Sequence, residues 1–138
     1  MGDFMYRILL PLDDTMERAR KQVRYVQSQP CADSELDVYV AHALSPGERQ
    51  VPRAMQRVDR IETVRYAIDT LEEAGISIEP REISSPPHEG ILAFCEEEHV
   101  DEIVMGGRKR SPVTKAILGS VTESVVLETD IPVTITGG

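Results

Sequence analysis

Five short apolar runs alternate along the chain with four longer segments whose apolar residues recur every three or four positions. The runs occupy residues 6–12, 36–44, 76–83, 101–107 and 131–136. Parallel strands require crossovers of about a dozen residues or more, usually helices, and such crossovers are right-handed. The alternation therefore predicts an α/β fold of three layers, in which helices cover both faces of an open, parallel, five-stranded, Rossmann-like sheet.

The helical segments are bounded by residues that start or stop helices. The first helix is predicted at 15–29, after the cap cluster Asp13-Asp14-Thr15 and before Pro30. The second runs from Met55 to Leu71, and Gly75 follows it where a helix commonly takes a left-handed residue.

Two more helices complete the pattern. One is predicted at 91–100, after a turn at 84–90, and its glutamates at 96–98 are expected on an acidic outer face. The last helix is predicted at 120–129. Pro80 cannot donate a hydrogen bond within a sheet, so the strand at 76–83 is expected at an edge.

Length and charge narrow the function classes. The 138 residues predict one domain spanning 1–138 with a single sizeable core. A net charge of -9 argues against nonspecific binding to nucleic acid or to anionic membranes. No apolar run approaches the roughly 20 residues of a membrane span, and the beginning of the chain carries no basic leader. We therefore expect a cytoplasmic protein without a nucleic-acid or membrane partner.

One stretch departs from this acidic character. From Ile103 to Thr122 the chain has no acidic residue and four basic ones. In open parallel sheets, ligands bind at the carboxyl ends of the strands, where the strand order reverses. Two strand ends carry informative residues: Pro11, Leu12 and Asp13 after the first strand, and Met105 and Gly106 after the fourth. A glycine there lets the backbone approach a ligand or take a positive φ.

The helix after this stretch begins with Gly119 and a capping-box pattern, Ser120-Val121-Thr122-Glu123. The free N–H groups and the positive end of the helix dipole suit a phosphate, and Arg108 and Lys109 would add positive charge. The alternative is that the box only caps the helix, and Glu123 then opposes an anion. The stretch matches neither the P-loop nor the dinucleotide fingerprint.

The sequence predicts no catalytic or metal constellation. Asp13 and Asp14 suggest a helix cap more than a catalytic pair, although a Mg²⁺ bridged by phosphates is compatible with them. No histidine or cysteine lies in an arrangement typical of a nucleophile or a metal site. Enzymatic activity is not predicted, beyond slow ATP hydrolysis at most.

These segments together resemble the universal stress protein family. The resemblance rests on the opening ILLPLDD, on His42 at the end of the second strand, on EGILAFCEEEHVDEIVMGG and on GSVTESVVLETDIPVTI. It implies the strand order 3-2-1-4-5 and a role as a cytoplasmic regulator of the stress response. It also implies a homodimer formed by the last strand, from Pro132 to Thr136.

The resemblance further implies a nucleotide site. The ATP-binding branch of the family carries Gly-x-x-Gly-x(9)-Gly-Ser/Thr; Gly106 and Gly119-Ser120 match it, whereas Lys109 stands where the second glycine is usual. ATP or a related adenine nucleotide is thus expected, and a dimeric interaction module without nucleotide is the alternative that Lys109 favours. The expected site comprises Pro11, Leu12, Asp13, Ala43, Met105, Gly106, Arg108, Lys109, Gly119, Ser120, Val121 and Thr122.

Overall fold

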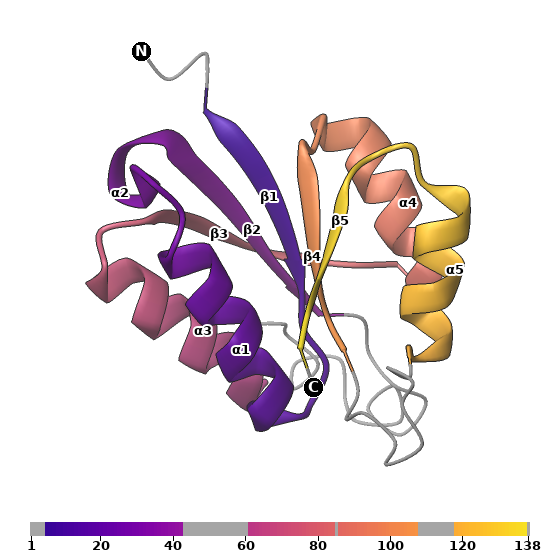
Figure 1. Cartoon of the computed structure of the whole chain (residues 1–138), viewed down its shortest axis with the longest axis horizontal. Coiled ribbons are helices and arrows are strands. Elements are labelled where there is room, and N and C mark those ends of the chain that lie inside the picture. The colour runs from indigo at the N-terminus through magenta and orange to yellow at the C-terminus, as the bar shows by residue number, and fades with distance from the viewer. Residues whose placement is uncertain (1–4, 43–60, 85, 108–117, 138) are drawn as a thin grey trace.

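The computed structural model contains one parallel sheet in the order β3-β2-β1-β4-β5, as the sequence and the family resemblance predict (Figure 1). The structure describes residues 5–42, 61–84, 86–107 and 118–137. The strands are β1 (Tyr6–Pro11), β2 (Leu36–His42), β3 (Ser77–Glu82), β4 (Glu102–Gly106) and β5 (Val133–Thr136). All four strand pairs are parallel.

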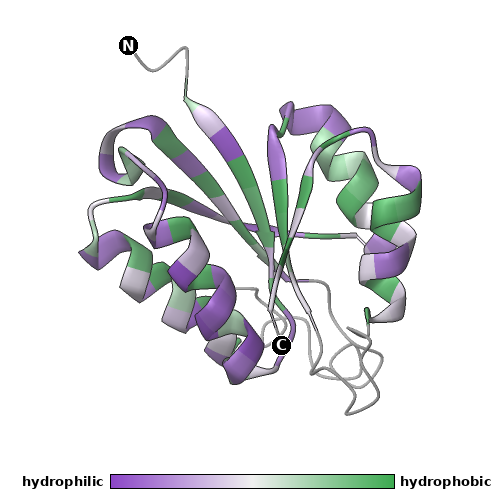
Figure 2. Cartoon of the chain, in the orientation of Figure 1, coloured by the Kyte–Doolittle hydropathy of each residue, from purple (hydrophilic) through white to green (hydrophobic). Residues whose placement is uncertain are grey.

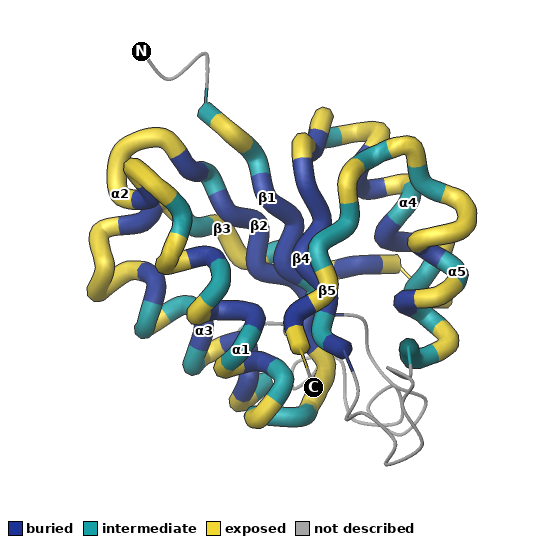
Figure 3. The backbone as a smooth tube through the Cα atoms, viewed as in Figure 1, coloured by how far each residue is buried: buried dark blue, intermediate teal, exposed yellow. Residues whose placement is uncertain are grey.

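Helices cover both faces of the sheet. On one face α1 (Met16–Gln27) and α3 (Glu62–Glu73) pack against an apolar core, and on the other α4 (Pro87–Glu98) and α5 (Ser120–Glu128) pack against a second one. Apolar residues of α1 and α3 line the first core, and Ile91, Phe94 and Val125 of α4 and α5 line the second. The central strands are buried along most of their length (Figure 3), and Figure 2 shows the hydropathy of each element. A short helix, α2 (Ala32–Glu35), precedes β2 and was not predicted.

Two expectations about single residues are confirmed. Gly75 has φ 80° just after α3, in the left-handed region that favours glycine. The strand that contains Pro80 lies at one edge of the sheet, where a missing N–H is tolerated.

The prediction for the third long helix was wrong at its start. α4 begins at Pro87, within the predicted turn, because proline is well accommodated in the first turn of a helix. Gly90 lies inside this helix, and a Cβ there would approach the Ser84 carbonyl oxygen to 2.0 Å. Glu98 is not purely on an outer face, since its carboxylate accepts hydrogen bonds from Tyr39 and Arg81.

The ladder between β1 and β4 is short. β1 pairs with β2 from Tyr6 to Pro11, whereas its pairing with β4 consists of Ile8 with Glu102 and Leu9 with Ile103. The strand order reverses at β1, so the two strands separate toward their carboxyl ends at the switch point of the sheet.

At the opposite end of the sheet, Glu102 is buried among hydroxyl groups. Its carboxylate accepts hydrogen bonds from Tyr6 of β1, Tyr25 of α1 and Thr134 of β5. Glu102 is 5% exposed, so these hydroxyls replace the water that a carboxylate otherwise binds. The cluster ties the edge strand β5 to the centre of the sheet.

This cluster predicts a loss of stability at alkaline pH. Partial burial, together with the hydrogen bond to Glu102 and its charge, raises the pKa of Tyr6 from 10.0 to about 12. The folded state therefore holds the tyrosine proton more tightly than the unfolded state does, and the resulting stability is full below pH 10.0 and lost as the pH rises toward about 12. Chemical unfolding across this range should show a shallower decline for Tyr6→Phe than for the wild type; equal slopes would contradict the assignment.

Candidate functional site

A cavity of about 340 Å³ lies at the carboxyl ends of β1 and β4 and reaches the beginning of α5. This volume is near the lower end of the range for small-molecule sites. The residues that line it are Pro11, Leu12, Asp13, Asp14, Arg18, Gln22, Ile83, Pro87, Ile91, Met105, Gly106, Gly119, Ser120, Val121 and Thr122.

The structure brings most of the predicted site residues to this cavity. Three come from the end of β1, two from the end of β4 and four from the start of α5: Pro11, Leu12, Asp13, Met105, Gly106, Gly119, Ser120, Val121 and Thr122. Ala43, Arg108 and Lys109 lie outside the described residues. The shared location agrees with the sequence analysis, and the binding role of these residues stays a prediction.

Sequence reasoning missed the contribution of α1. Arg18 and Gln22 both line the cavity, as do Ile83, Pro87 and Ile91 from the opposite side. A signal was present in the sequence, because residues four apart on a helix share a face and this pair follows Asp13 closely. The polar Gln22 lies next to Val23 on a helix face that otherwise buries apolar residues.

Asp13 is held in place by its own loop and by α1. Its Oδ1 accepts a hydrogen bond of 2.9 Å from the Thr15 amide, and its Oδ2 accepts one of 2.9 Å from Arg18 Nε and lies 2.8 Å from Arg18 Nη2. The Thr63 hydroxyl at the start of α3 donates to the Asp13 carbonyl oxygen. Both carboxylate oxygens are therefore engaged by the protein.

Gln22 closes the split between β1 and β4. Gln22 is buried, with 2% of its surface exposed. Its Nε2 donates to the carbonyl oxygens of Pro11 at 2.9 Å and Val104 at 3.0 Å. Both carbonyls lie beyond the last residue pair of the β1–β4 ladder. The amide of Gln22 thus replaces strand-to-strand hydrogen bonds at the floor of the cavity.

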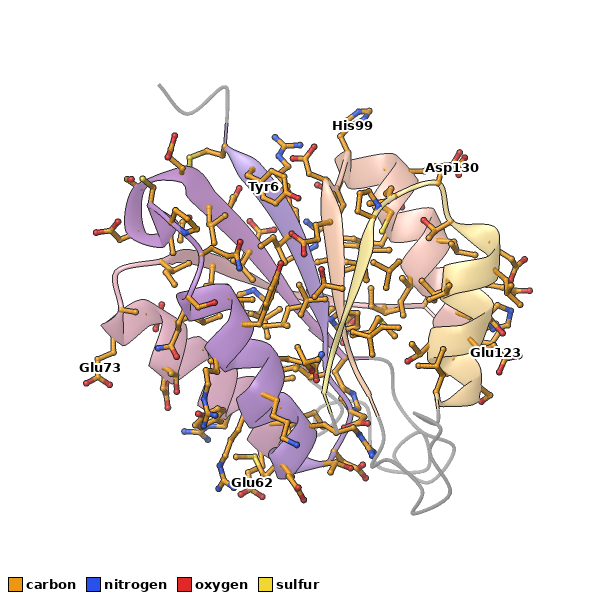
Figure 4. The ribbon with its side chains drawn as sticks, in the orientation of Figure 1. Tyr6, Glu62, Glu73, His99, Glu123 and Asp130 are labelled. Carbon is orange, nitrogen blue, oxygen red and sulfur yellow. The ribbon has the colours of Figure 1, made fainter. Side chains whose placement is uncertain are left out.

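The predicted capping box does not form. The N-cap of α5 is Gly119, with φ -70° and ψ 161°, and no side chain caps the helix. The first bond within the helix runs from the Glu123 amide to the Gly119 carbonyl oxygen, so the amides at residues 120–122 have no acceptor inside it. Glu123 is exposed and points outward from α5, away from the sheet (Figure 4). The start of α5 is therefore open to the cavity.

The two glycines at the end of β4, Gly106 and Gly107, serve packing within the chain. Among the residues described, Gly75 is the glycine with positive φ. Gly106 and Gly107 therefore do not adopt the left-handed backbone conformation that favours glycine. A Cβ on Gly106 would lie 3.0 Å from Gln22 Oε1 and 3.2 Å from Arg18 Cβ. One on Gly107 would lie 2.7 Å from the Thr136 carbonyl oxygen. These glycines let α1 and β5 pack closely against the end of β4.

Within the described residues, no cluster of three or more histidine, cysteine, aspartate or glutamate side chains has the arrangement of a metal site. Burial raises the pKa of the Cys95 thiol to about 11, so this thiol is protonated at neutral pH. No helix in the described segments is long and apolar enough to cross a membrane.

The family follows from a match over nearly the whole chain. The model of the universal stress protein family matches residues 5–137. This chain belongs to the universal stress protein family. A universal stress protein of Methanocaldococcus jannaschii is 35% identical over 65 residues, which are 47% of this chain and 40% of that protein. The aligned part thus covers less than half the length of this curated relative.

Solved structures of the family share the fold. The universal stress protein of Archaeoglobus fulgidus is 28% identical, with a TM-score of 0.76 over 95% of this chain and 98% of its own. The structure from A. fulgidus in complex with dAMP is 24% identical, with a TM-score of 0.72 over 96% and 98%. A universal stress protein in complex with cAMP is 23% identical, with a TM-score of 0.67 over 98% of this chain and 98% of its own. A family member from Arabidopsis thaliana with AMP bound is 12% identical, with a TM-score of 0.68 over 96% of this chain and 91% of its own.

Replacing Gln22 tests the bridge between β1 and β4. Gln22→Leu keeps a side chain of similar size but leaves two buried carbonyl oxygens without a donor, which costs about 1–3 kcal/mol for each group. We expect urea unfolding to show a destabilisation of about 2 kcal/mol or more. Gln27→Leu, at an exposed position at the end of the same helix, is the matched control. Equal stability of the two variants would show that the bridge contributes nothing.

Proposed function

We propose that this protein binds an adenine nucleotide, ATP or a related one, in the cavity between β1, β4 and α5. The observation that carries the proposal is the uncapped first turn of α5: residues 120–122 line the cavity, and their amides have no acceptor inside the helix. Unpaired amides at a helix N-terminus, aided by the helix dipole, form a favourable site for a phosphate. The apolar walls at Leu12, Ile83 and Ile91 suit a base.

The relatives support this choice of ligand. Universal stress proteins of the same fold have been solved with dAMP, cAMP and AMP, which share the adenine base and a phosphate. The adenine base suits the apolar walls of the cavity, and the phosphate suits the free amides at the start of α5. We infer that nucleotide occupancy makes the protein a regulator of the stress response in the cytoplasm.

A magnesium ion would accompany the nucleotide through its phosphates. Mg²⁺ is commonly held by one or two carboxylates together with substrate phosphates. Asp14 is the carboxylate in the described lining that is free of the Arg18 ion pair. We therefore propose Asp14 as the protein group nearest to such an ion, with Asp13 committed to Arg18.

Removing a single amide from α5 tests the phosphate site. Ser120 is the first helical residue, a position that proline tolerates, and Gly119 before it already has the extended backbone that a following proline requires. Ser120→Pro deletes one N–H donor without disturbing the helix. We expect calorimetry to show binding of ATP and AMP weakened roughly tenfold or more, as for one lost hydrogen bond to a charged group.

Ser120→Ala is the control for this experiment, because it removes the hydroxyl and keeps the amide. We expect its affinity to lie close to that of the wild type. Equal affinities of the proline and alanine variants would refute phosphate binding by this amide. Gly106→Val is a poorer probe, since its side chain would press on Gln22 and Arg18 whether or not a ligand binds.

We also propose that β5 pairs with its counterpart in a second copy of the chain. β5 is an edge strand, and edge strands present unpaired backbone groups that favour association. The carbonyls of Pro132 and Thr136 bond to β4, so the N–H of Ile135 points away from β4. Ile135 on this strand has an exposed apolar side chain. This dimer is compatible with the alternative function, an interaction module without nucleotide.

Ile135→Pro tests the edge pairing. The substitution removes an outward N–H and leaves the hydrogen bonds between β4 and β5 in place. We expect sedimentation velocity to show monomers for this variant and dimers for the wild type and for Ile135→Val. A dimer that persists in Ile135→Pro would exclude this interface. Val133 is a less suitable position for this test, because its side chain packs partly against the core and a substitution there would confound folding with association.

A further inference from the structure

We propose that Arg18 gives the cavity its preference for a phosphorylated nucleoside over the unphosphorylated one. The inference rests on the proposed nucleotide site and assigns a specificity role to a side chain from α1. It follows from the charges of the lining, from the position of the guanidinium and from the contacts of its stem.

The described lining is poor in positive charge. It contains two carboxylates, Asp13 and Asp14, and one cationic side chain, Arg18. The negative charge of these two carboxylates would oppose the phosphate of a nucleotide. The amides of α5 carry only partial charges. A cationic side chain that offsets these carboxylates therefore favours a phosphate.

The guanidinium of Arg18 is fixed by the fork that it forms with Asp13. Nε donates to Asp13 Oδ2 at 2.9 Å, and Nη2 lies 2.8 Å from the same oxygen and donates to the Thr15 hydroxyl at 2.7 Å. The side chain of Arg18 is 27% exposed, against 49% for that of Asp13, so the pair lies at the mouth of the cavity. Asp13 is thereby neutralised before any ligand arrives.

The stem of Arg18 brings this charge to the end of β4. A Cβ built on Gly106 would lie 3.2 Å from Arg18 Cβ and 3.3 Å from its Cδ, so the stem crosses directly over the Gly106 backbone. Arg18 thus joins the ends of β1 and β4, the two strand ends that form the cavity. Its Nη1 group has no hydrogen-bond partner in the described part of the chain and can donate to a phosphate while the fork to Asp13 stays intact.

The opposite arrangement is a latch, in which the ion pair blocks the cavity and must open before a ligand enters. A latch predicts that removing Arg18 strengthens binding, whereas the proposed role predicts that it weakens binding of phosphorylated ligands selectively. A merely structural role predicts equal loss for every ligand. Comparing two ligands that differ by one phosphate separates these cases.

The experiment titrates adenosine and AMP, each by calorimetry, into the wild type, Arg18→Met, Arg18→Lys and Arg20→Met. Arg20 is exposed on the same helix and does not line the cavity, so its variant controls for the loss of one positive charge. We expect Arg18→Met to lose roughly tenfold or more in affinity for AMP and less than about threefold for adenosine. Arg18→Lys should keep part of the preference, because it keeps the charge and loses the fork.

Three outcomes would overturn the inference alone: equal loss for both ligands, tighter AMP binding by Arg18→Met, or the same loss in Arg20→Met as in Arg18→Met. Urea unfolding of each variant checks that the fold is retained, and Arg18→Lys provides the comparison if Arg18→Met is unstable. A wild-type protein that binds none of adenosine, AMP and ATP would instead refute the proposed nucleotide site itself.

Discussion

The separation of β1 from β4 is the constraint on which the rest of the structure depends. Beyond the two residue pairs of their ladder, the carbonyl oxygens of Pro11 and Val104 receive no hydrogen bond from the facing strand. Gln22 supplies both missing donors from α1, and this holds the helix tightly over the gap. The same closeness leaves little room for a Cβ at Gly106 and places Arg18 in the lining of the cavity. A backbone requirement of the sheet thus fixes one wall of the site.

Polar groups at the two ends of the sheet differ in whether the protein itself supplies their hydrogen-bond partners. At the amino end, the carboxylate of Glu102 is buried and satisfied by the hydroxyls of Tyr6, Tyr25 and Thr134, so the cluster acts as a structural tie. At the carboxyl end, the amides at the start of α5 have no acceptor within the helix, and the residues that carry them line an open cavity. The structural tie and the candidate site thus lie at opposite ends of the strands, and ligands of open parallel sheets generally bind at the carboxyl end.

The failed capping box makes the site more open than the sequence suggested. Serine and glutamate at matching spacing are typical of a capped helix, and a capped helix has fewer free amides. In the fold, the chain enters α5 with Gly119 as N-cap, so Ser120 is one residue too far along to cap, and Glu123 points outward. The local sequence pattern cannot reveal this shift of one position, because the residue at which α5 begins depends on the path of the chain before it.

The sequence by itself determined the layers, the parallel sheet and the strand ends that meet, because hydrophobic periodicity and crossover length depend on local spacing. It also indicated Asp13, Met105, Gly106 and the start of α5 as neighbours, since parallel strands bring their carboxyl ends to one edge. Only the tertiary structure decided that Arg18 and Gln22 belong to the same site, and that Gly106 and Gly107 pack closely against α1 and β5. These facts depend on how closely one helix approaches the split sheet. That approach is set by contacts between residues far apart in the chain, which local spacing does not encode.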